Sequence, residues 1–300
     1  MTDQIQTHAT NRELGMSEIG AILGLSQFAS AADVAIKKLS HQPDIKAQPT
    51  GDTSPMYWGL ANERAIADAF GVVMDVKVRA DGHTYRKDNL RTVCHLDYRI
   101  EGQPAIVECK HPGSIFSGDW GEPGTASVPE YILAQCHGQM WHVDKAERVY
   151  VPRLIGHRFD VYCIERDENW FPVLEKAVTD FWALVDVGDI PPLDYSRSNV
   201  NDTLKLMYPD FHPGDVVQLG DREQALQHEL DDVSAQRLEL EKAEAALKAR
   251  LKHRVERHQF GLLPDGRAYK RSVTKRKGFT VAASEIDTFR LLKELPAVLR

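Results

Sequence analysis

Two carboxylates and a lysine, Asp97, Glu108 and Lys110, have the types and the spacing that metal-assisted hydrolysis uses. They lie in residues 92–111, where apolar and polar side chains alternate on either side of Gly102-Gln103. This alternation predicts two short antiparallel strands joined by a two-residue loop, and a glycine in its first position suits a type II′ turn. The chemistry therefore depends on a hairpin that brings the acidic side chains onto one face.

The register of this hairpin sets two acidic side chains directly across the ladder. Like charges in that position repel each other and destabilise a sheet. A divalent cation between them reverses the sign of this interaction, and carboxylate oxygens suit Mg²⁺ or Mn²⁺. Lys110 adds a positive charge on the same face, beside the proposed cation. The alternative to a metal site is a solvated polar sheet face with a Glu–Lys diagonal pair. The opposed pairs are Asp97 and Glu108, His95 and Lys110, Leu96 and Cys109, and Tyr98 and Val107.

The composition is that of an ordinary globular protein. The chain has 300 residues, of which 42% are hydrophobic and 27% charged, enough for one large domain or two smaller ones. A net charge of −7 argues against nonspecific coating of nucleic acid, although a local basic channel is compatible with it. No run approaches the roughly 18 apolar residues of a membrane helix, and the polar N-terminus is unlike a signal peptide. The four dispersed cysteines predict reduced thiols in a cytoplasm.

A glutamate lies on the apolar stripe of a predicted helix. Residues 56–70 have helical periodicity and end before Gly71, and residues 72–79 alternate as a strand would. The stripe predicted to be buried is Leu60, Glu63, Ile66, Ala67 and Phe70. Because a buried carboxylate needs a partner, Glu63 is either a site residue or a sign that the stripe is misassigned.

Two glutamines share the apolar side of a later helix, which is predicted to begin near residue 127. Gln135 and Gln139 are four residues apart, so both can hydrogen-bond one neighbour, a phosphate or a metal-bound water. Interior glutamines satisfied by backbone groups are the alternative. His137 and His142 on the same helix have no assigned role.

A hydroxyl and a guanidinium near the N-terminus predict an anion site. Ser17 is predicted to be the N-cap of a helix that ends before Gly24, and Arg12 precedes it by five residues. A helix N-terminus beside an arginine can bind one phosphate. A plain capped helix with a surface arginine is the alternative.

Several ordered blocks of residues resemble one nuclease family. Asp97 followed by Glu108-Cys109-Lys110 resembles the D…(D/E)xK core of the PD-(D/E)xK superfamily, with Leu96 where many members have proline. Residues 12–26, the W-G-x-x-x-E segment ending at Glu63, and the Q-x-x-x-Q-M segment at 135–140 resemble phage-type recombination nucleases that are YqaJ-like or lambda-exonuclease-like. The resemblance spans about residues 10–190.

This resemblance implies an α/β fold, with a restriction-endonuclease-like mixed central sheet of about five strands flanked by helices, over residues 1–192. Residues 193–220 are expected to be an irregular connector. Residues 221–300 are expected to be an α-helical and basic C-terminal extension for DNA contact or assembly.

The extension contains a long helix, predicted over residues 222–258, and a basic hairpin. The helix has leucines in a four-three alternation that Arg237 and Glu244 interrupt, so packing on its own domain and oligomerisation are equal alternatives. The hairpin, turning at Pro264-Asp265-Gly266, indicates a phosphate contact or a solvated basic strand. Ser284 is predicted to cap a final helix. The basic residues of the hairpin are Arg267, Lys270, Arg271, Lys275, Arg276 and Lys277.

The resemblance also implies a metal site. Asp97 and Glu108 would bind one or two Mg²⁺ ions, or Mn²⁺, with the main chain at Cys109 as a further ligand. Glu63 would complete the second metal position or hold its water. Lys110 would orient the attacking water and help to deprotonate it.

Further roles follow from the same resemblance. Gln135 and Gln139 would position the lysine or the water, and Arg12 and Ser17 would hold DNA phosphate. The expected activity is 5′→3′ hydrolysis of one strand from the ends of linear double-stranded DNA, during phage recombination in the cytoplasm of a bacterial or phage-infected cell. The expected partners are a single-strand annealing protein and further copies of the chain in a ring.

Three other functions remain open. An endonuclease of the same superfamily would cut covalently closed DNA as well as linear DNA. A catalytically silent DNA-binding module would use the basic extension, but the intact acidic pair and lysine argue against it. A structural coiled-coil adaptor would require every N-terminal block to be accidental.

Overall fold

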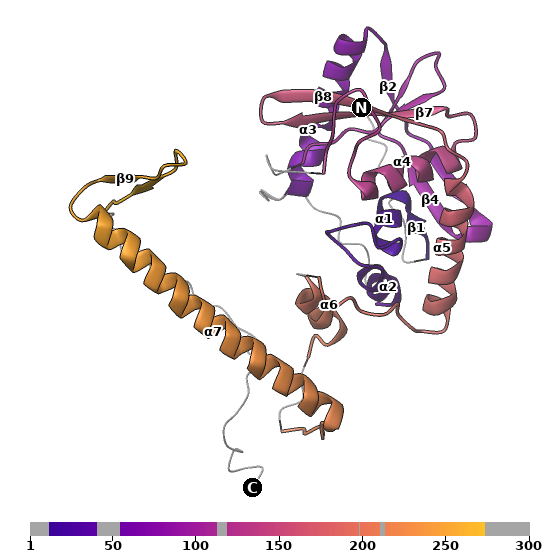
Figure 1. The fold of residues 1–300 in the computed structure, drawn as a ribbon. Coiled ribbons are helices and arrows are strands. Elements are labelled where there is room, and N and C mark those ends of the chain that lie inside the picture. Colours follow the sequence, from indigo (N-terminus) through magenta and orange to yellow (C-terminus); the bar gives the residue numbers. More distant parts are fainter. Residues whose placement is uncertain (1–11, 41–54, 113–118, 198, 211–213, 274–300) are drawn as a thin grey trace. The chain divides into compact units, whose positions relative to one another are not determined.

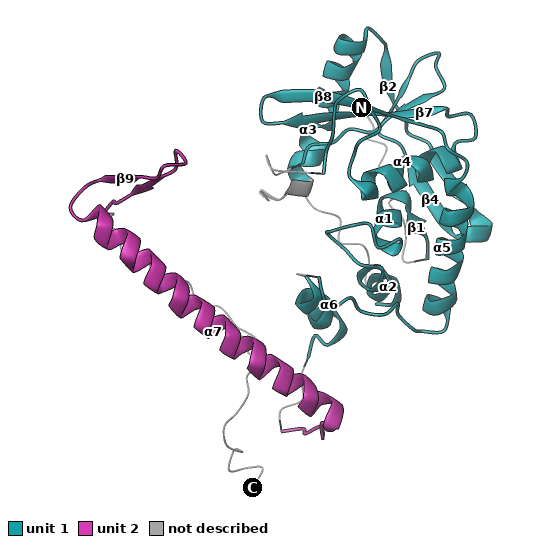
Figure 2. Cartoon of the chain, in the orientation of Figure 1, with its two compact units in different colours: residues 1–212 teal, residues 213–300 magenta. Residues whose placement is uncertain are grey.

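The structure is a computed structural model that describes residues 12–40, 55–112, 119–197, 199–210 and 214–273. Contacts divide the chain into two compact units, residues 1–212 and 213–300 (Figure 2). No helix in these ranges is long and apolar enough to cross a membrane.

The first unit contains, in order, β1 (Leu14–Gly15), η1 (Met16–Glu18), α1 (Ile19–Ile22), α2 (Ala31–Leu39), α3 (Pro55–Met74), β2 (Val78–Ala80), β3 (Thr84–Lys87), η2 (Asp88–Leu90), β4 (Thr92–His95), β5 (Tyr98–Ile100), β6 (Ala105–Val107), α4 (Glu130–His142), β7 (Arg148–Ile155), β8 (Arg158–Glu165), α5 (Trp170–Asp186) and α6 (Val200–Met207) (Figure 1). The second contains α7 (Asp221–Val255), β9 (Phe260–Leu262) and β10 (Ala268–Lys270).

A five-stranded mixed sheet, in the order β2-β5-β6-β7-β8, forms the centre of the first unit. Strands β6 and β7 run parallel with α4 in the crossover between them, and the other neighbours are antiparallel. Side chains alternate between the faces: Val149 and Val151 join the cluster that contains α4, whereas Val107 joins the cluster that contains α3. The predicted α/β fold, with a mixed sheet of about five strands flanked by helices, is confirmed.

The predicted hairpin register is correct for the part that pairs. Tyr98 lies opposite Val107, as expected. Residues 92–100 do not form one strand, however, because the ladder stops at Leu96 and the chain bends at Asp97. The Leu96 side chain is fully buried in the main cluster. Strand β4 therefore joins a second sheet of order β1-β4-β3, and His95 pairs with Thr84 there rather than with Lys110.

The turn of this hairpin differs from the type II′ prediction. Residues 101–104 form a four-residue loop, in which the Gln103 N–H donates to the Ile100 carbonyl at 3.4 Å. Gly102 takes the third position of that turn with φ of 72°, a left-handed conformation that glycine adopts readily. The register survives because the longer loop adds one residue on each side.

Helix α3 continues one turn beyond the predicted end at Gly71. It stops at Met74, and Asp75 follows in the left-handed region with φ of 52°. The strand predicted over residues 72–79 is therefore wrong except at β2. The predicted buried stripe holds at Ile66, Ala67 and Phe70 but not at Leu60, which is 59% exposed.

The N-terminal helix is shorter than expected, and Ser17 is not its N-cap. Ser17 lies inside the 3₁₀ turn η1, and α1 has only four residues. The Glu18 side chain takes the capping role, since its Oε2 accepts hydrogen bonds from the Gly15 N–H (2.9 Å) and from Lys38 Nζ (2.8 Å). The predicted anion site at the N-terminus of a regular helix is therefore not formed in this way.

Three unassigned side chains have packing roles. The His137 ring stacks on Trp170 with centroids 4.8 Å apart. His142 Nδ1 lies 2.9 Å from the Gly138 carbonyl, and its Nε2 lies 2.9 Å from Thr92 Oγ1. Trp120 packs against the ring of Tyr162, 4.9 Å away, and against the guanidinium of Arg153, 4.6 Å away. Trp120 therefore packs within the first unit.

The predicted irregular connector is partly ordered against the first unit. It contains α6, where Thr203 Oγ1 donates to Asp33 Oδ1 at 2.5 Å. Nearby, Arg197 Nη2 donates to the carbonyls of Ser26 (2.6 Å) and Ala29 (3.1 Å). These contacts join residues 197–203 to the N-terminal segment of the first unit.

In the second unit, the long helix and the hairpin are both present. Helix α7 has 35 residues, and β9 and β10 pair antiparallel around Pro264-Asp265-Gly266. The Gly266 N–H donates to the Leu263 carbonyl at 3.1 Å. The basic residues 275–277 and the helix predicted at Ser284 lie outside the described residues.

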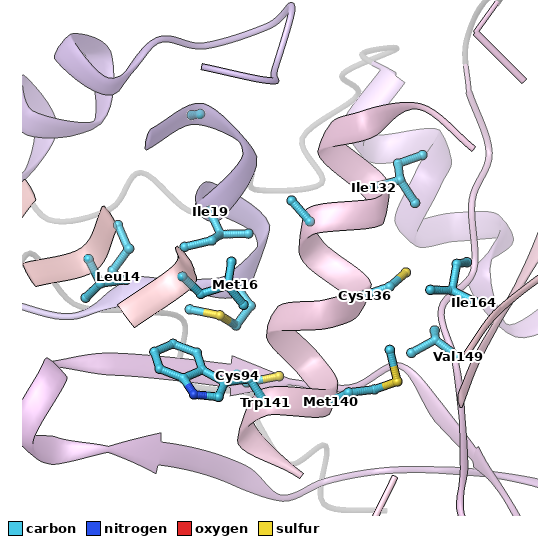
Figure 3. Packing of buried hydrophobic residues seen from close by; sticks show 14 of the residues in the cluster. Leu14, Met16, Ile19, Cys94, Ile132, Cys136, Met140, Trp141, Val149 and Ile164 are labelled. Atoms are coloured by element: carbon cyan, nitrogen blue, oxygen red, sulfur yellow. The ribbon is translucent and has the colours of Figure 1, made fainter. Parts of the chain in front are cut away.

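The N-terminal segment packs closely on α4. Figure 3 shows Met16 and Ile19 beside the helix that carries Cys136 and Met140. A Cβ on Gly20 would lie 2.7 Å from Tyr131 Cβ and 3.0 Å from its Cα. Only glycine fits at this crossing without movement of the backbone.

We expect Gly20→Ala to lower the free energy of unfolding by about 1–3 kcal/mol, because the added methyl overlaps the backbone of α4. Urea denaturation measures this change. Gly59→Ala is the matched control: no atom lies within 4 Å of its Cβ position, and it lies within α3. The control should be neutral or stabilising by about 0.5–1 kcal/mol. Equal stability of the two variants would contradict the close crossing.

Candidate functional site

The side chain of Glu108 is the centre of a hydrogen-bond network. Glu108 directly follows β6 and is 4% exposed. Its Oε1 accepts hydrogen bonds from Lys110 Nζ (2.7 Å) and Gln135 Nε2 (2.8 Å). Its Oε2 accepts one from Gln139 Nε2 (2.5 Å), and Gln135 Oε1 accepts one from Lys110 Nζ (3.0 Å). The structure thus brings four of the predicted site residues into direct contact.

Strand pairing explains why Glu108 and Lys110 point the same way. The main-chain N–H groups of both residues donate to carbonyls of β7, at 2.9 Å each. Alternate residues of a strand project to one face, which here is the face that α4 covers. The Cys109 N–H between them points away from β7 and donates to Asp97 Oδ2 at 2.8 Å. The Asp97 carboxylate therefore stands beside the same three-residue segment.

Three carboxylates lie close enough for their charges to interact. Burial raises the pKa of Asp97 well above its usual range, and the charges of Glu108 and Glu63 add to this effect. Burial and the charge of Glu108 also raise the pKa of Glu63, which extends from α3. Lys110 opposes both shifts without cancelling them. The structure therefore contains the repulsion that the hairpin register predicts.

Lys110 is held as an ammonium in this arrangement. Burial acts to lower its pKa, but the charges of Glu108 and Asp97 outweigh burial and raise the pKa above its ordinary value. A protonated amine donates hydrogen bonds and accepts none. In this state Lys110 is therefore a source of positive charge and of donors, and not a base.

The residues of this site fit a divalent cation by their chemistry. Three mutually repelling carboxylates offer the hard oxygens that Mg²⁺ and Mn²⁺ prefer, and a cation would relieve their repulsion. The buried Oε1 of Gln139 has no hydrogen-bond donor in the described part of the chain, so it can accept one from a water.

In the structure the candidate metal ligands do not converge on one common position where a cation could bind. Within the described ranges, no three His, Cys, Asp or Glu side chains already stand in a ligating arrangement. The ammonium of Lys110 holds Glu108 Oε1 instead. Burial raises the pKa of the Cys109 thiol, so a contribution from Cys109 would come from its carbonyl and not from a thiolate.

One side chain beside this network was not predicted as a site residue. Tyr131 lies four residues before Gln135 on α4 and so projects from the same face. Burial raises its pKa while Lys110 lowers it, which places the phenol within the field of that ammonium. The spacing of Tyr131, Gln135 and Gln139, four residues each, is the sequence signal that could have identified it.

Arg12 and Ser17 are exposed at the N-terminal end of the described chain. Met16, next to Ser17, packs on α4: its Sδ lies 2.7 Å from the position that a Cβ on Gly138 would take. Gly138 is adjacent to Gln139, so η1 runs beside the helix that supplies both glutamines. The roles of Arg12 and Ser17 in holding phosphate stay predictions.

Comparison with known proteins finds a family profile that part of this chain matches. Residues 7–146 match the family profile described as a YqaJ-like viral recombinase domain. The uncharacterized protein YqaJ of Bacillus subtilis (strain 168) is 25% identical over 95% of this chain and 86% of its own length. All of the predicted site residues, from Arg12 to Gln139, fall within the matched range.

Two solved structures are also similar to the chain. One is an alkaline exonuclease, LHK-Exo, from Laribacter hongkongensis, with a TM-score of 0.47 and 16% identity over 62% of this chain and 94% of that chain. The other is a phage related exonuclease from Haemophilus somnus 129PT, with a TM-score of 0.43 and 13% identity over 58% of this chain and 94% of that chain.

We expect Asp97→Asn to raise the free energy of unfolding by about 1 kcal/mol near neutral pH in EDTA. A folded-state pKa above the unfolded value favours folding at low pH, and this contribution is lost as pH rises through the folded pKa. At neutral pH the cost of holding the Asp97 carboxyl in this site, whether ionised or protonated, therefore destabilises the metal-free protein. Asparagine removes the charge and can still accept the Cys109 N–H.

Urea denaturation with Asp68→Asn as control checks this expectation. Asp68 is exposed on α3 and pairs with Arg64, so its loss should change stability by less than about 0.5 kcal/mol. A loss of stability in Asp97→Asn would show that the carboxylates do not repel each other in the folded protein.

Proposed function

We propose that this chain, whose residues 7–146 carry a YqaJ-like viral recombinase domain, is a divalent-metal-dependent deoxyribonuclease acting on the ends of linear double-stranded DNA. The observation that supports it most is the ion pair of the buried Glu108 with the half-buried Lys110, held by two glutamines and joined by the carboxylates of Asp97 and Glu63. Hydrolysis of a phosphodiester needs positive charge beside the phosphate and an oriented water. The site offers groups for both.

Asp97, Glu108 and Glu63, with the Cys109 carbonyl, would hold Mg²⁺ or Mn²⁺. The bound cation would supply positive charge to the scissile phosphate and lower the pKa of a water.

In this proposal Lys110 orients the attacking water and balances negative charge on the phosphate. Against the effect of burial, the charges of Glu108 and Asp97 raise its pKa when no cation is bound to them. A cation held by the same carboxylates would offset that effect, so the lysine would also help to deprotonate the attacking water. Gln135 positions the ammonium through its Oε1, and Gln139 fixes Glu108 from the other side.

The biological setting follows from the domain and remains part of the proposal. Digestion would run 5′→3′ and leave single strands for an annealing protein during phage recombination. Arg12 and Ser17 would hold DNA phosphate, and the chain would assemble with further copies of itself. An endonuclease of the same superfamily is the second candidate, and a silent DNA-binding module the third. Duplex labelled at its 5′ or 3′ ends, incubated with Mg²⁺ or with EDTA beside covalently closed DNA, distinguishes all three.

We expect Lys110→Met to reduce Mg²⁺-dependent nucleotide release from linear duplex by about 10²-fold or more. The substitution removes the donor that holds both Glu108 and the attacking water. Lys145→Ala, which changes an exposed lysine outside the site, should retain full activity. Both variants should still unfold cooperatively. If Lys110→Met digests DNA at the wild-type rate, the proposed mechanism is wrong.

We further expect Ser17→Ala to reduce the preference for 5′-phosphorylated over 5′-hydroxyl ends by about tenfold, because one hydrogen bond to a charged group is lost. Initial rates on the two substrates measure this preference. Ser234→Ala, exposed on α7, should leave it unchanged. Equal rates of the wild-type protein on both ends would exclude the phosphate contact.

A further inference from the structure

Helix α7 presents an apolar stripe that nothing described in its own unit covers. None of its 35 residues is buried. The large apolar side chains of the stripe are 56–71% exposed, and they recur at alternating spacings of four and three residues. Such a heptad repeat on a long exposed helix is typical of one strand of a coiled coil. The residues with this spacing are Leu226, Leu230, Val233, Leu240 and Leu247, with Leu251 completing the repeat.

Two charges inside this stripe discriminate between the possible partners. Arg237 and Glu244 take the two remaining positions of the repeat. In a parallel pair of identical helices each residue of the seam faces its own counterpart, so Arg237 would meet Arg237 and Glu244 would meet Glu244. Desolvated like charges in two core layers, with only the Leu240 layer between them, cost more than the apolar layers can readily offset. A parallel dimer is therefore disfavoured.

An antiparallel pair places the same charges in a favourable arrangement. With full overlap of two α7 helices, Leu226 lies opposite Leu251 of the second copy, and Leu230 lies opposite Leu247. Arg237 then faces Leu240 of the second copy, and Glu244 of that copy lies in the next layer of the seam. The two-fold symmetry of the pair places Glu244 of the first helix next to Arg237 of the second in the same way. The ion pairs that these residues make within one helix, Arg237 with Glu241 and Glu244 with Lys248, are exposed and weak, so they can be exchanged for pairs across the seam.

The charges outside the stripe agree with this orientation. Without the stripe residues Arg237 and Glu244, residues 221–238 contain five acidic and one basic side chain, whereas residues 239–255 contain two acidic and five basic ones. An antiparallel pair sets the acidic half of each helix along the basic half of the other. In that register the flanking residue Glu229 also faces Arg250 of the second copy, and opposite charges in such flanking positions set orientation in coiled coils.

We propose that α7 pairs with α7 of a second copy of this chain as an antiparallel two-stranded coiled coil. The apolar layers lie at its two ends, and two crossed Arg237–Glu244 contacts lie near its middle. The overlap is about 50 Å long, from a rise of about 1.5 Å per residue. The charged positions that make a parallel coiled coil imperfect are the determinants of the antiparallel one.

A charge exchange in the full-length protein tests the pairing. Light scattering over a dilution series should give the mass of two chains or an even multiple of two. Arg237→Glu and Glu244→Arg should each weaken this association about tenfold or more, because each places like charges side by side across the seam. The double variant should restore it to within about threefold of wild type. Lys242→Glu, the same change of charge away from the stripe, is the matched control and should have little effect.

Disulfide trapping tests the orientation separately. Leu230→Cys combined with Leu247→Cys should yield a covalent dimer on mild oxidation, whereas Leu230→Cys alone should not, because its two copies lie about 25 Å apart in the antiparallel pair. The wild-type protein, with its four native cysteines, is the background control. A covalent dimer from the single variant, a monomeric mass at all concentrations, or failure of the double charge exchange to restore association would each overturn the proposal.

Discussion

The hydrogen bonds to the buried carboxylate of Glu108 are the constraint on which the first unit depends. A carboxylate with so little exposure is tolerated only when its oxygens are satisfied. Lys110, Gln135 and Gln139 provide three donors, and two of these come from α4. The crossover helix must therefore lie on that face of the sheet, with its glutamines above the end of β6. The N-terminal segment then packs on α4 at Tyr131 and Gly138, next to the two glutamines, so one buried charge organises elements from much of the unit.

Much of this site could be predicted because its determinants are local. The period of two placed Tyr98 opposite Val107, and the four-residue spacing placed both glutamines on one helix face. The division of residues 92–100 between two sheets could not be predicted, since the alternation of apolar and polar residues continues across the bend. The continuation of α3 beyond Gly71 could not be predicted either. A Cβ there would lie 3.1 Å from the Val76 carbonyl, so that glycine serves a close contact rather than a helix end.

The two units use charge on an apolar face in different ways. In the first, neighbouring carboxylates raise each other's pKa, and the repulsion is the property that makes a cation favourable there. In the second, Arg237 and Glu244 interrupt an apolar stripe and restrict which partner geometry can cover it. In both cases a charged residue at a position suited to an apolar one lowers the stability of the isolated unit. It also increases selectivity, for a cation in the first unit and for one helix orientation in the second. The overall net charge of −7 reveals neither arrangement.

The parallel pairing of β6 with β7 also sets the order of events while the chain is being made. Val107 pairs with Tyr150, and all of α4 lies between them in the sequence. The acidic hairpin therefore leaves the ribosome well before the glutamines and the strand that position Glu108. Such non-local pairing forms late, because the intervening loop must close first. An incomplete nascent chain carries the carboxylates without the groups that hold them, so the proposed cleavage of DNA would have to await a finished fold.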